Sequence, residues 1–270
     1  MRGVSQGSFA AGRERLETLL ASGSTDAAAL GDALFAVTDI LAANPAVRRA
    51  LTDPARDGQA KAGLVDRLFA GRLPGDAVDV LAGAARDRWS AAGDITDAVE
   101  SYAVSSVLAA ADEAGRLDAV EDELFRFART VEADQGLRDA FSYRTAGTDR
   151  KAELVRQLLA GRAAPETVRL AVQAAVRPRG LRTEQVLEHF VQAAAERRQQ
   201  VVAQVVAATP LTTEQRNRLE ATLRRRYGRV RLNVDVDPAV LGGIRVQIGS
   251  ELVDGTVAAR LEEARRRLAG

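Results

Sequence analysis

Hydrophobic residues in the first two thirds of the chain recur every three or four residues, the spacing that places them on one face of an α-helix. Residues that end helices, such as the Asn44-Pro45 pair and Gly71, interrupt the pattern at short intervals. This part of the chain is therefore predicted to be a bundle of short helices. The positions on these helix faces are Leu30, Leu34, Val37 and Leu41; Leu64, Val65 and Leu68; Val120, Leu124, Phe127 and Val131; Leu154, Val155 and Leu158; and Val186, Leu187, Phe190 and Val191.

The helical region contains an internal repeat with an offset of 90 residues. Without any gap, residues 30–72 are identical to residues 120–162 at 14 of 43 positions. The only two lysines of the chain, Lys61 and Lys151, are equivalent, and an Ala-Gly-Arg triplet follows each at the same distance. The repeat predicts a duplicated helical unit.

Near residue 200 the hydrophobic pattern changes from helical to alternating. Every second residue of segment 201–207 is apolar, from Val201 to Ala207, and segments 230–236 and 244–248 alternate apolar with polar residues, as strands with one buried face do. Between the first two segments, Thr212 and Gln215 have the spacing of a capping box, which predicts the start of a helix. The pattern indicates a second domain that contains both strands and helices.

Two turn signals complete the prediction. Gly249-Ser250 predicts a tight turn into a fourth strand at Leu252-Val253, and Asp254-Gly255-Thr256 supplies cap residues for a last helix. The predicted fold class is mostly α: an N-terminal helical bundle with a duplicated unit, followed by a small α/β C-terminal domain. The predicted domains are a first, extra helical unit at 1–95, a second helical unit at 96–199 and the α/β domain at 200–270.

The residue types argue against catalysis by this chain. Cysteine is absent, which excludes a disulfide, a thiolate metal site and a cysteine nucleophile, and no phosphate-binding loop is present. The only histidine, His189, follows Glu188, but adjacent residues do not share a helical face. We interpret His189 as an ordinary surface or boundary residue. We expect no catalytic residue, no cofactor and no metal site.

Charge is divided unevenly along the chain, although the formal net charge is only +1. Residues 1–140 carry 15 basic and 23 acidic side chains, and the remainder carries 23 basic and 14 acidic ones. Such polarity suits two different partners at the two ends, or reflects a drift in surface composition. No apolar run is long enough to span a bilayer and the first eight residues do not resemble a secretory signal, so we expect membrane association only through partners.

Two arginine runs, at residues 224–226 and 265–267, raise the possibility of a nucleic-acid partner, because clustered cations release counterions from phosphates. Each run closes a predicted helix, where the helix dipole favours cations, and no aromatic residues are interleaved for base stacking. We expect no nucleic-acid partner. A helical nucleic-acid-binding or scaffold adaptor is the alternative hypothesis for the function.

A set of motifs in the C-terminal domain is more specific than these patterns. Residues 208–215 read ATPLTTEQ, 232–238 read LNVDVDP, 241–249 read LGGIRVQIG and 253–256 read VDGT. In order and spacing they resemble the delta subunits of F-type ATP synthases, a family similar to the mitochondrial oligomycin-sensitivity-conferring protein. The resemblance covers roughly residues 100–270. The additional helical unit before it resembles the long actinobacterial form of the family.

This resemblance implies a non-catalytic connector in the peripheral stalk of the ATP synthase. It would link the catalytic alpha/beta head to subunit b of the membrane sector and resist rotational torque during proton-driven ATP synthesis. The helical domain would dock on the N-termini of the alpha subunits, and the C-terminal domain would hold the end of subunit b, at the cytoplasmic face of the cell membrane. The family motif would have a structural role at Asp237, Pro238, Gly242, Gly243, Gly249, Asp254 and Gly255.

A groove between helices of a bundle can accept an amphipathic helix of a partner by burying its apolar face. The candidate groove is lined by Leu154, Val155 and Leu158, or by the equivalent residues of the first copy. Taken singly, each of these residues is better explained as a plain core position. The repeat does not decide which copy would dock on the head.

Overall fold

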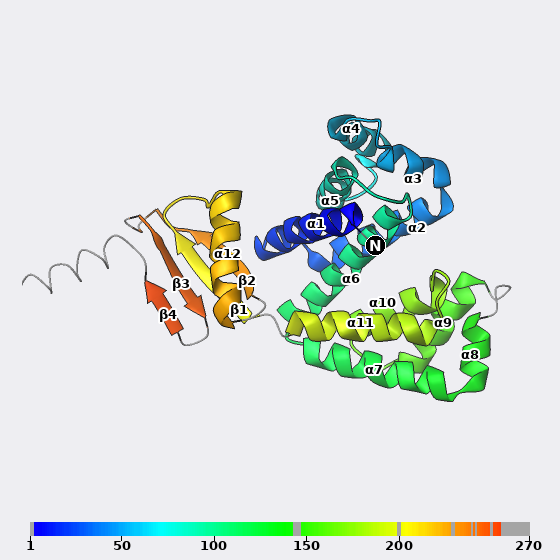
Figure 1. Cartoon of the computed structure of the whole chain (residues 1–270). Helices are drawn as coiled ribbons and strands as arrows, with labels where there is room; N and C mark the ends of the chain where they lie inside the picture. Colours follow the sequence, from blue (N-terminus) through cyan, green and yellow to red (C-terminus); the bar gives the residue numbers. More distant parts are fainter. Residues whose placement is uncertain are drawn as a thin grey trace, which may run out of the picture. The chain divides into compact units, whose positions relative to one another are not determined.

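A computed structural model describes residues 3–142, 147–198, 201–227, 230–238, 240, 242–248 and 251–254. The chain divides into two compact units, one made of residues 1–16 and 25–198 and the other of residues 17–24 and 199–270. The first unit is helical, whereas the second holds the described strands, as Figure 1 shows. The mostly α fold with a small α/β part is confirmed.

Eleven helices precede the first strand within the described residues. They are α1 (Val4–Ala21), α2 (Ala27–Ala43), α3 (Pro45–Thr52), α4 (Gly58–Phe69), α5 (Gly75–Arg86), α6 (Asp94–Glu113), α7 (Leu117–Ala133), α8 (Gln135–Ser142), α9 (Thr148–Leu159), α10 (Pro165–Val176) and α11 (Thr183–Arg198).

The helix bounds reproduce the repeat seen in the sequence. Each of α2, α3, α4 and α5 begins and ends 90 residues before its counterpart among α7, α8, α9 and α10. The first residues of α1 and α6 are also separated by this offset. The first residues of α6 and α11 are separated by one residue less. Helix α6 is therefore both the last helix of the first copy and the first helix of the second. In Figure 1 it runs between the two groups of helices.

Tight contacts attach the first copy to α6. Gly12 lies directly against Tyr102. A Cβ atom added to this glycine would lie 2.0 Å from the Tyr102 hydroxyl oxygen. The same hydroxyl donates a hydrogen bond of 3.0 Å to the carbonyl of Phe9, whose ring stacks on that of Tyr102. Gly31 of α2 lies against the backbone and side chain of Val107. Glycine is needed where helices approach this closely.

The predicted helix faces form the core of the unit. Leu34, Val37 and Leu41 are fully buried, and so are their counterparts Leu124 and Val131. Burial of each such side chain contributes about 1.5–3 kcal/mol relative to exposure. Most of the stability of the helical unit therefore comes from the apolar faces identified in the sequence.

Equivalent residues also perform equivalent local tasks in the two copies. Gly71 and Gly161, which follow α4 and α9, have φ angles of +75° and +65°, a region that glycine enters without steric cost. Lys61 and Lys151 each donate to a backbone carbonyl, that of Asp87 at 2.8 Å and that of Phe141 at 2.5 Å, although these two acceptors are not equivalent positions of the repeat. Burial lowers the pKa of both lysines. Each lysine therefore ties its own helix to the end of a neighbouring helix.

The second unit contains a four-stranded sheet with the order β2-β1-β3-β4. Strand β1 (Val201–Ala207) is parallel to β2 (Val230–Val236) and antiparallel to β3 (Ile244–Ile248), which pairs antiparallel with β4 (Glu251–Asp254). The four strands lie at the four predicted positions. The predicted last helix falls outside the described residues.

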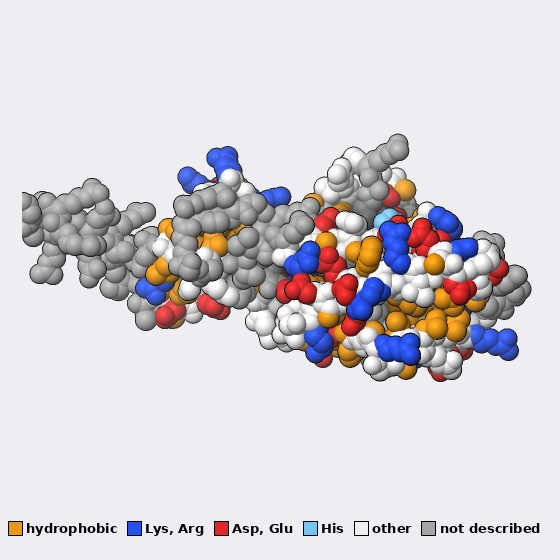
Figure 2. All heavy atoms as spheres, turned by 90° about the horizontal axis from the view of Figure 1, so that it is seen from below, with side chains coloured by type: hydrophobic (Ala, Val, Ile, Leu, Met, Phe, Trp, Pro, Cys, Tyr) orange, Lys and Arg blue, Asp and Glu red, His pale blue; other side chains and the backbone are white. Residues whose placement is uncertain are grey.

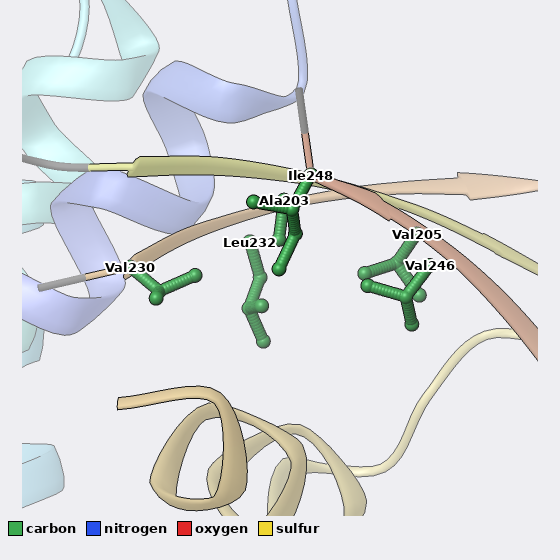
Figure 3. Packing of buried hydrophobic residues seen from close by; sticks show 6 residues of the cluster. All are labelled: Ala203, Val205, Val230, Leu232, Val246 and Ile248. Carbon is green, nitrogen blue, oxygen red and sulfur yellow. The ribbon is translucent and has the colours of Figure 1, made fainter. Parts of the chain in front are cut away.

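Helix α12 (Thr213–Tyr227) covers one face of the sheet. Figure 3 shows the buried side chains of the strands pointing toward it. Leu211, Leu219 and Leu223 pack against this cluster from the segment that contains the helix. The cluster consists of Ala203, Val205, Val230, Leu232, Val246 and Ile248.

The predicted capping box opens α12. The backbone N–H of Gln215 donates to Oγ1 of Thr212 at 3.2 Å, and the N–H of Thr212 donates to the Gln215 side-chain oxygen at 2.9 Å. Two otherwise unpaired donors are satisfied in this way.

No single described helix is long and apolar enough to cross a membrane. The pair α2 and α3, which bends by 103° at its junction, meets the criterion by length and composition only.

Candidate partner-binding surfaces

The candidate groove lies on α9, which packs against α10. Val155 is fully buried, so it belongs to the core of the bundle. Leu154 and Leu158 are half-buried and one turn apart, so they form a partly open apolar stripe. The first copy repeats this arrangement on α4, where Leu64 and Leu68 are half-buried. Both copies therefore present the same short stripe.

A pocket of about 390 Å³ lies between α6, α11 and the loop that joins α10 to α11. Arg179 of this loop, with a φ of +50°, donates to Glu100 at 2.7 Å and also to Asp97. Partial burial of Glu100 raises the pKa of its carboxyl group despite the opposing charge of Arg179. The arginine thus ties the start of α11 to α6. His189 lies at the pocket, where it is exposed.

A second arginine joins two helix ends of the second copy. Arg116, just before α7, donates to Glu166 in the first turn of α10 through Nε at 3.2 Å and through a terminal nitrogen at 2.5 Å. Burial disfavours the charged carboxylate of Glu166, but hydrogen bonds from Arg116 and from its own backbone outweigh burial and lower its pKa. This two-pronged contact fixes the start of α10 against the start of α7.

The glycines of the C-terminal motif satisfy a backbone requirement. Gly242 and Gly243 have φ angles of +68° and +81°, which only glycine adopts without strain. The N–H of Asp237 donates to the carbonyl of Ala207 at 2.9 Å, so the chain after β2 stays attached to β1. Pro238 follows in a turn. These features agree with a structural role for this part of the motif.

The other motif residues are described in part or not at all. Asp254 ends β4, in register with Arg245 of β3. Gly249 and Gly255 lie outside the described residues. The structural role expected for all seven motif positions stays a prediction.

Among the described residues, no group of three histidine, cysteine or acidic residues is placed to hold a metal ion. Figure 2 shows acidic and basic side chains interspersed over one face of the helical unit, with hydrophobic side chains between them.

The sites that sequence reasoning did not find are the arginine contacts of Arg116 and Arg179. The Pro178-Arg179-Gly180 turn signal indicates the loop, but nothing in the sequence indicates its acidic partners.

Taken together, the helical unit, the separate α/β unit and the motif that follows β2 define a mostly helical protein of two compact units. Residues 98–268 match the family model described as ATP synthase delta (OSCP) subunit. The chain is 50% identical to the ATP synthase subunit delta of Kineococcus radiotolerans over 269 residues, which cover 99% of this chain and 98% of the relative. It is 48% identical to that of Streptomyces griseus over the full length of both chains, and 49% identical to that of Streptomyces coelicolor over 100% of this chain and 98% of the relative.

The chain therefore belongs to the ATP synthase delta (OSCP) subunit family. It is a non-catalytic subunit of the ATP synthase complex, and its membrane association is through that complex. Its full-length similarity to actinobacterial relatives confirms the long form expected from the sequence. A chain of the Toxoplasma gondii mitochondrial ATP synthase also matches, at 20% identity over 62% of this chain and 95% of that chain, with a TM-score of 0.26.

Proposed function

We propose that this chain connects the catalytic head of the ATP synthase to its peripheral stalk at the cytoplasmic face of the membrane. The helical unit docks on the N-termini of the alpha subunits, and the α/β unit holds the end of subunit b. The chain thereby resists the torque that rotation exerts on the head during proton-driven synthesis.

The division of the chain into two compact units carries this proposal. A connector needs two surfaces that bind different partners without competing, and two units with separate cores provide them. The internal contacts of the helical unit suit a part that bears load, since closely packed interiors deform little. The contacts of Arg116 with Glu166 and of Arg179 with Asp97 and Glu100 tie helix ends that would otherwise be free to shift.

Exposed apolar side chains support a partner surface on each unit. The stripe of Leu154 and Leu158 and its copy at Leu64 and Leu68 are each half-buried, so each leaves apolar surface that one amphipathic helix can cover. On the α/β unit, the edge strand β4 exposes Leu252 and Val253 by 56% and 49%. Neighbouring residues of a strand point to opposite faces of the sheet, so these two side chains offer a partner one apolar contact on each side of the sheet edge.

The test is a pull-down of the tagged full chain from detergent-solubilised membranes at moderate salt, followed by quantification of the alpha, beta and b subunits. We expect Leu154→Asp combined with Leu158→Asp, or the equivalent change at Leu64 and Leu68, to reduce recovery of alpha and beta but not of b. Gln157→Asp is the matched control, because it adds the same charge to an exposed position of α9.

The complementary change, Leu252→Asp with Val253→Asp, is expected to reduce recovery of b and leave alpha and beta in place. If wild type recovers nucleic acid or unrelated proteins instead of these subunits, the connector proposal is wrong and the adaptor alternative gains. If neither leucine pair affects the alpha subunit, the head contact lies elsewhere on the chain.

A further inference from the structure

Two equivalent phenylalanines differ in their surroundings. Phe35 of α2 and Phe125 of α7 occupy the same repeat position, 90 residues apart. Phe35 is 7% exposed, whereas Phe125 is 46% exposed. The same side chain at the same place of the helix is therefore covered in the first copy and open in the second.

Two ion pairs link this face of α2 to α10 of the second copy and to the residue that follows α10. Asp32 pairs with Arg169 at 2.6 Å, and Asp39 pairs with Arg177 at 2.7 Å. Phe35 is three residues after the first aspartate and four before the second, so all three lie on one helical face. The order of the pairs shows that the two helices run side by side in the same direction, with Phe35 between the two ion pairs.

The corresponding face of α7 consists of Asp122, Phe125 and Arg129, which we call the α7 face. Its charges make exposed ion pairs: Arg126 pairs with Asp122 at 2.9 Å, and Arg129 pairs with Glu132 and, at 3.9 Å, with Glu188 of α11. Arg129 also lies 5.2 Å from the centre of the Phe125 ring. Exposed pairs of this kind stabilise a fold little, so they exchange readily for contacts with a partner.

We propose that the α7 face docks an amphipathic helix of another ATP synthase subunit. By analogy with α10 on α2, the partner helix runs alongside α7 with an apolar stripe over Phe125. It carries a basic residue opposite Asp122 and, eight residues later, an acidic residue opposite Arg129. The acidic residue is required because Arg129 stands where the first copy has Asp39.

Charge excludes the two equivalent helices of a second copy of this chain. Helix α10 would place Arg177 opposite Arg129, and in α5 the residue equivalent to Arg169 is Asp79, which would face Asp122. Like charges in direct contact destabilise an interface. These two helices of a second copy are therefore excluded, and we take the occupant to be a different polypeptide. The inference rests on the proposed function only in taking that polypeptide from the same complex, and it is independent of where the alpha subunits bind.

The absence of cysteine from the chain allows a direct test in the intact complex. Arg126→Cys places one thiol beside the α7 face, where a benzophenone maleimide can be attached before photolysis. Ala36→Cys is the matched control, because it is the equivalent exposed position beside the covered face of α2. We expect cross-links from position 126 to another subunit at several times the yield from position 36, within a segment that has the stated charge spacing.

A second change separates docking from mere proximity. Phe125→Glu in the Arg126→Cys chain is expected to reduce the cross-link at least fivefold while the recovery of alpha, beta and b stays unchanged. Equal cross-linking from positions 126 and 36, cross-linking to a second copy of the chain, or insensitivity to Phe125→Glu would each overturn the inference. Failure of the proposed function is distinguishable, because the head or stalk subunits would then be missing from the purified complex itself.

Discussion

Equivalent residues of the two helical copies diverge where their surroundings differ. Gly31 lies against α6 and leaves no room for a side chain, whereas its counterpart Glu121 has space to pair with Arg198 at 3.3 Å. Thr38 donates to the carbonyl of Leu34 within α2, and the counterpart of this threonine is an alanine. Each copy has thus kept the core positions of the repeat and adapted the positions around them.

The Glu166 carboxylate gives a prediction with a defined pH dependence. Its pKa in the folded protein lies below the ordinary value of 4.5, so its stabilising contribution is present above that value and is lost as the pH falls through the folded pKa. We expect Glu166→Gln to lower the free energy of unfolding by about 1 kcal/mol at pH 7, from loss of charge-assisted hydrogen bonds. Chemical denaturation of the full chain between pH 3 and pH 7 measures this difference.

The difference between wild type and Glu166→Gln should shrink toward zero at the acidic end of this range. Glu153→Gln is the control, because Glu153 is exposed and its 3.7 Å pair with Arg156 is a surface contact. It should change stability by less than about 0.5 kcal/mol. An effect of Glu166→Gln that is the same at every pH would contradict the assigned role of the Arg116 contact.

The capping box of α12 gives a prediction at the level of one element. Thr212→Ala removes the acceptor for the Gln215 N–H and should cost about 1 kcal/mol. Because the helix covers the apolar face of the sheet, the loss should appear as faster amide exchange in the first turn of α12 and in β1. Thr222→Ala is the control, since its hydroxyl only donates to the carbonyl of Arg218 within the same helix. If amide exchange is equally fast in both variants, the capping box does not control the local opening of α12.

Elements were predictable from sequence because their signals are local. The capping residues Thr212 and Gln215, the stop at Asn44-Pro45 and the alternating strand at 230–236 each determine their own segment. Contacts between elements leave no such signal. Phe35 is buried and Phe125 is exposed, although the repeat makes the two residues look alike in the sequence. The candidate stripe was identified, but the full burial of Val155 was not visible in a pattern that marks all three residues as apolar.

At the scale of the whole molecule, the shared helix changes how the duplication is understood. The predicted boundary between residues 95 and 96 lies within the first turn of α6, so a helix that both copies use joins them. Tyr102 and Val107 of this helix contact Gly12 and Gly31 of the first copy, while Glu100 contacts Arg179 of the second. A first copy cut at the predicted boundary would lose the surface on which α1 and α2 pack.

This arrangement predicts different behaviour for two fragments. Residues 1–113 retain α6 and should unfold cooperatively on heating, with helical circular dichroism that is lost in one transition. Residues 1–93 lack it and expose the apolar face of α2, so they should show weak helical signal and no cooperative transition. Because α6 belongs to both copies, residues 94–198 should also unfold cooperatively. If residues 1–93 unfold as sharply as residues 1–113, the first copy is complete without α6. The duplication would then have added a self-sufficient domain. It would not have extended an existing bundle that shares its first helix.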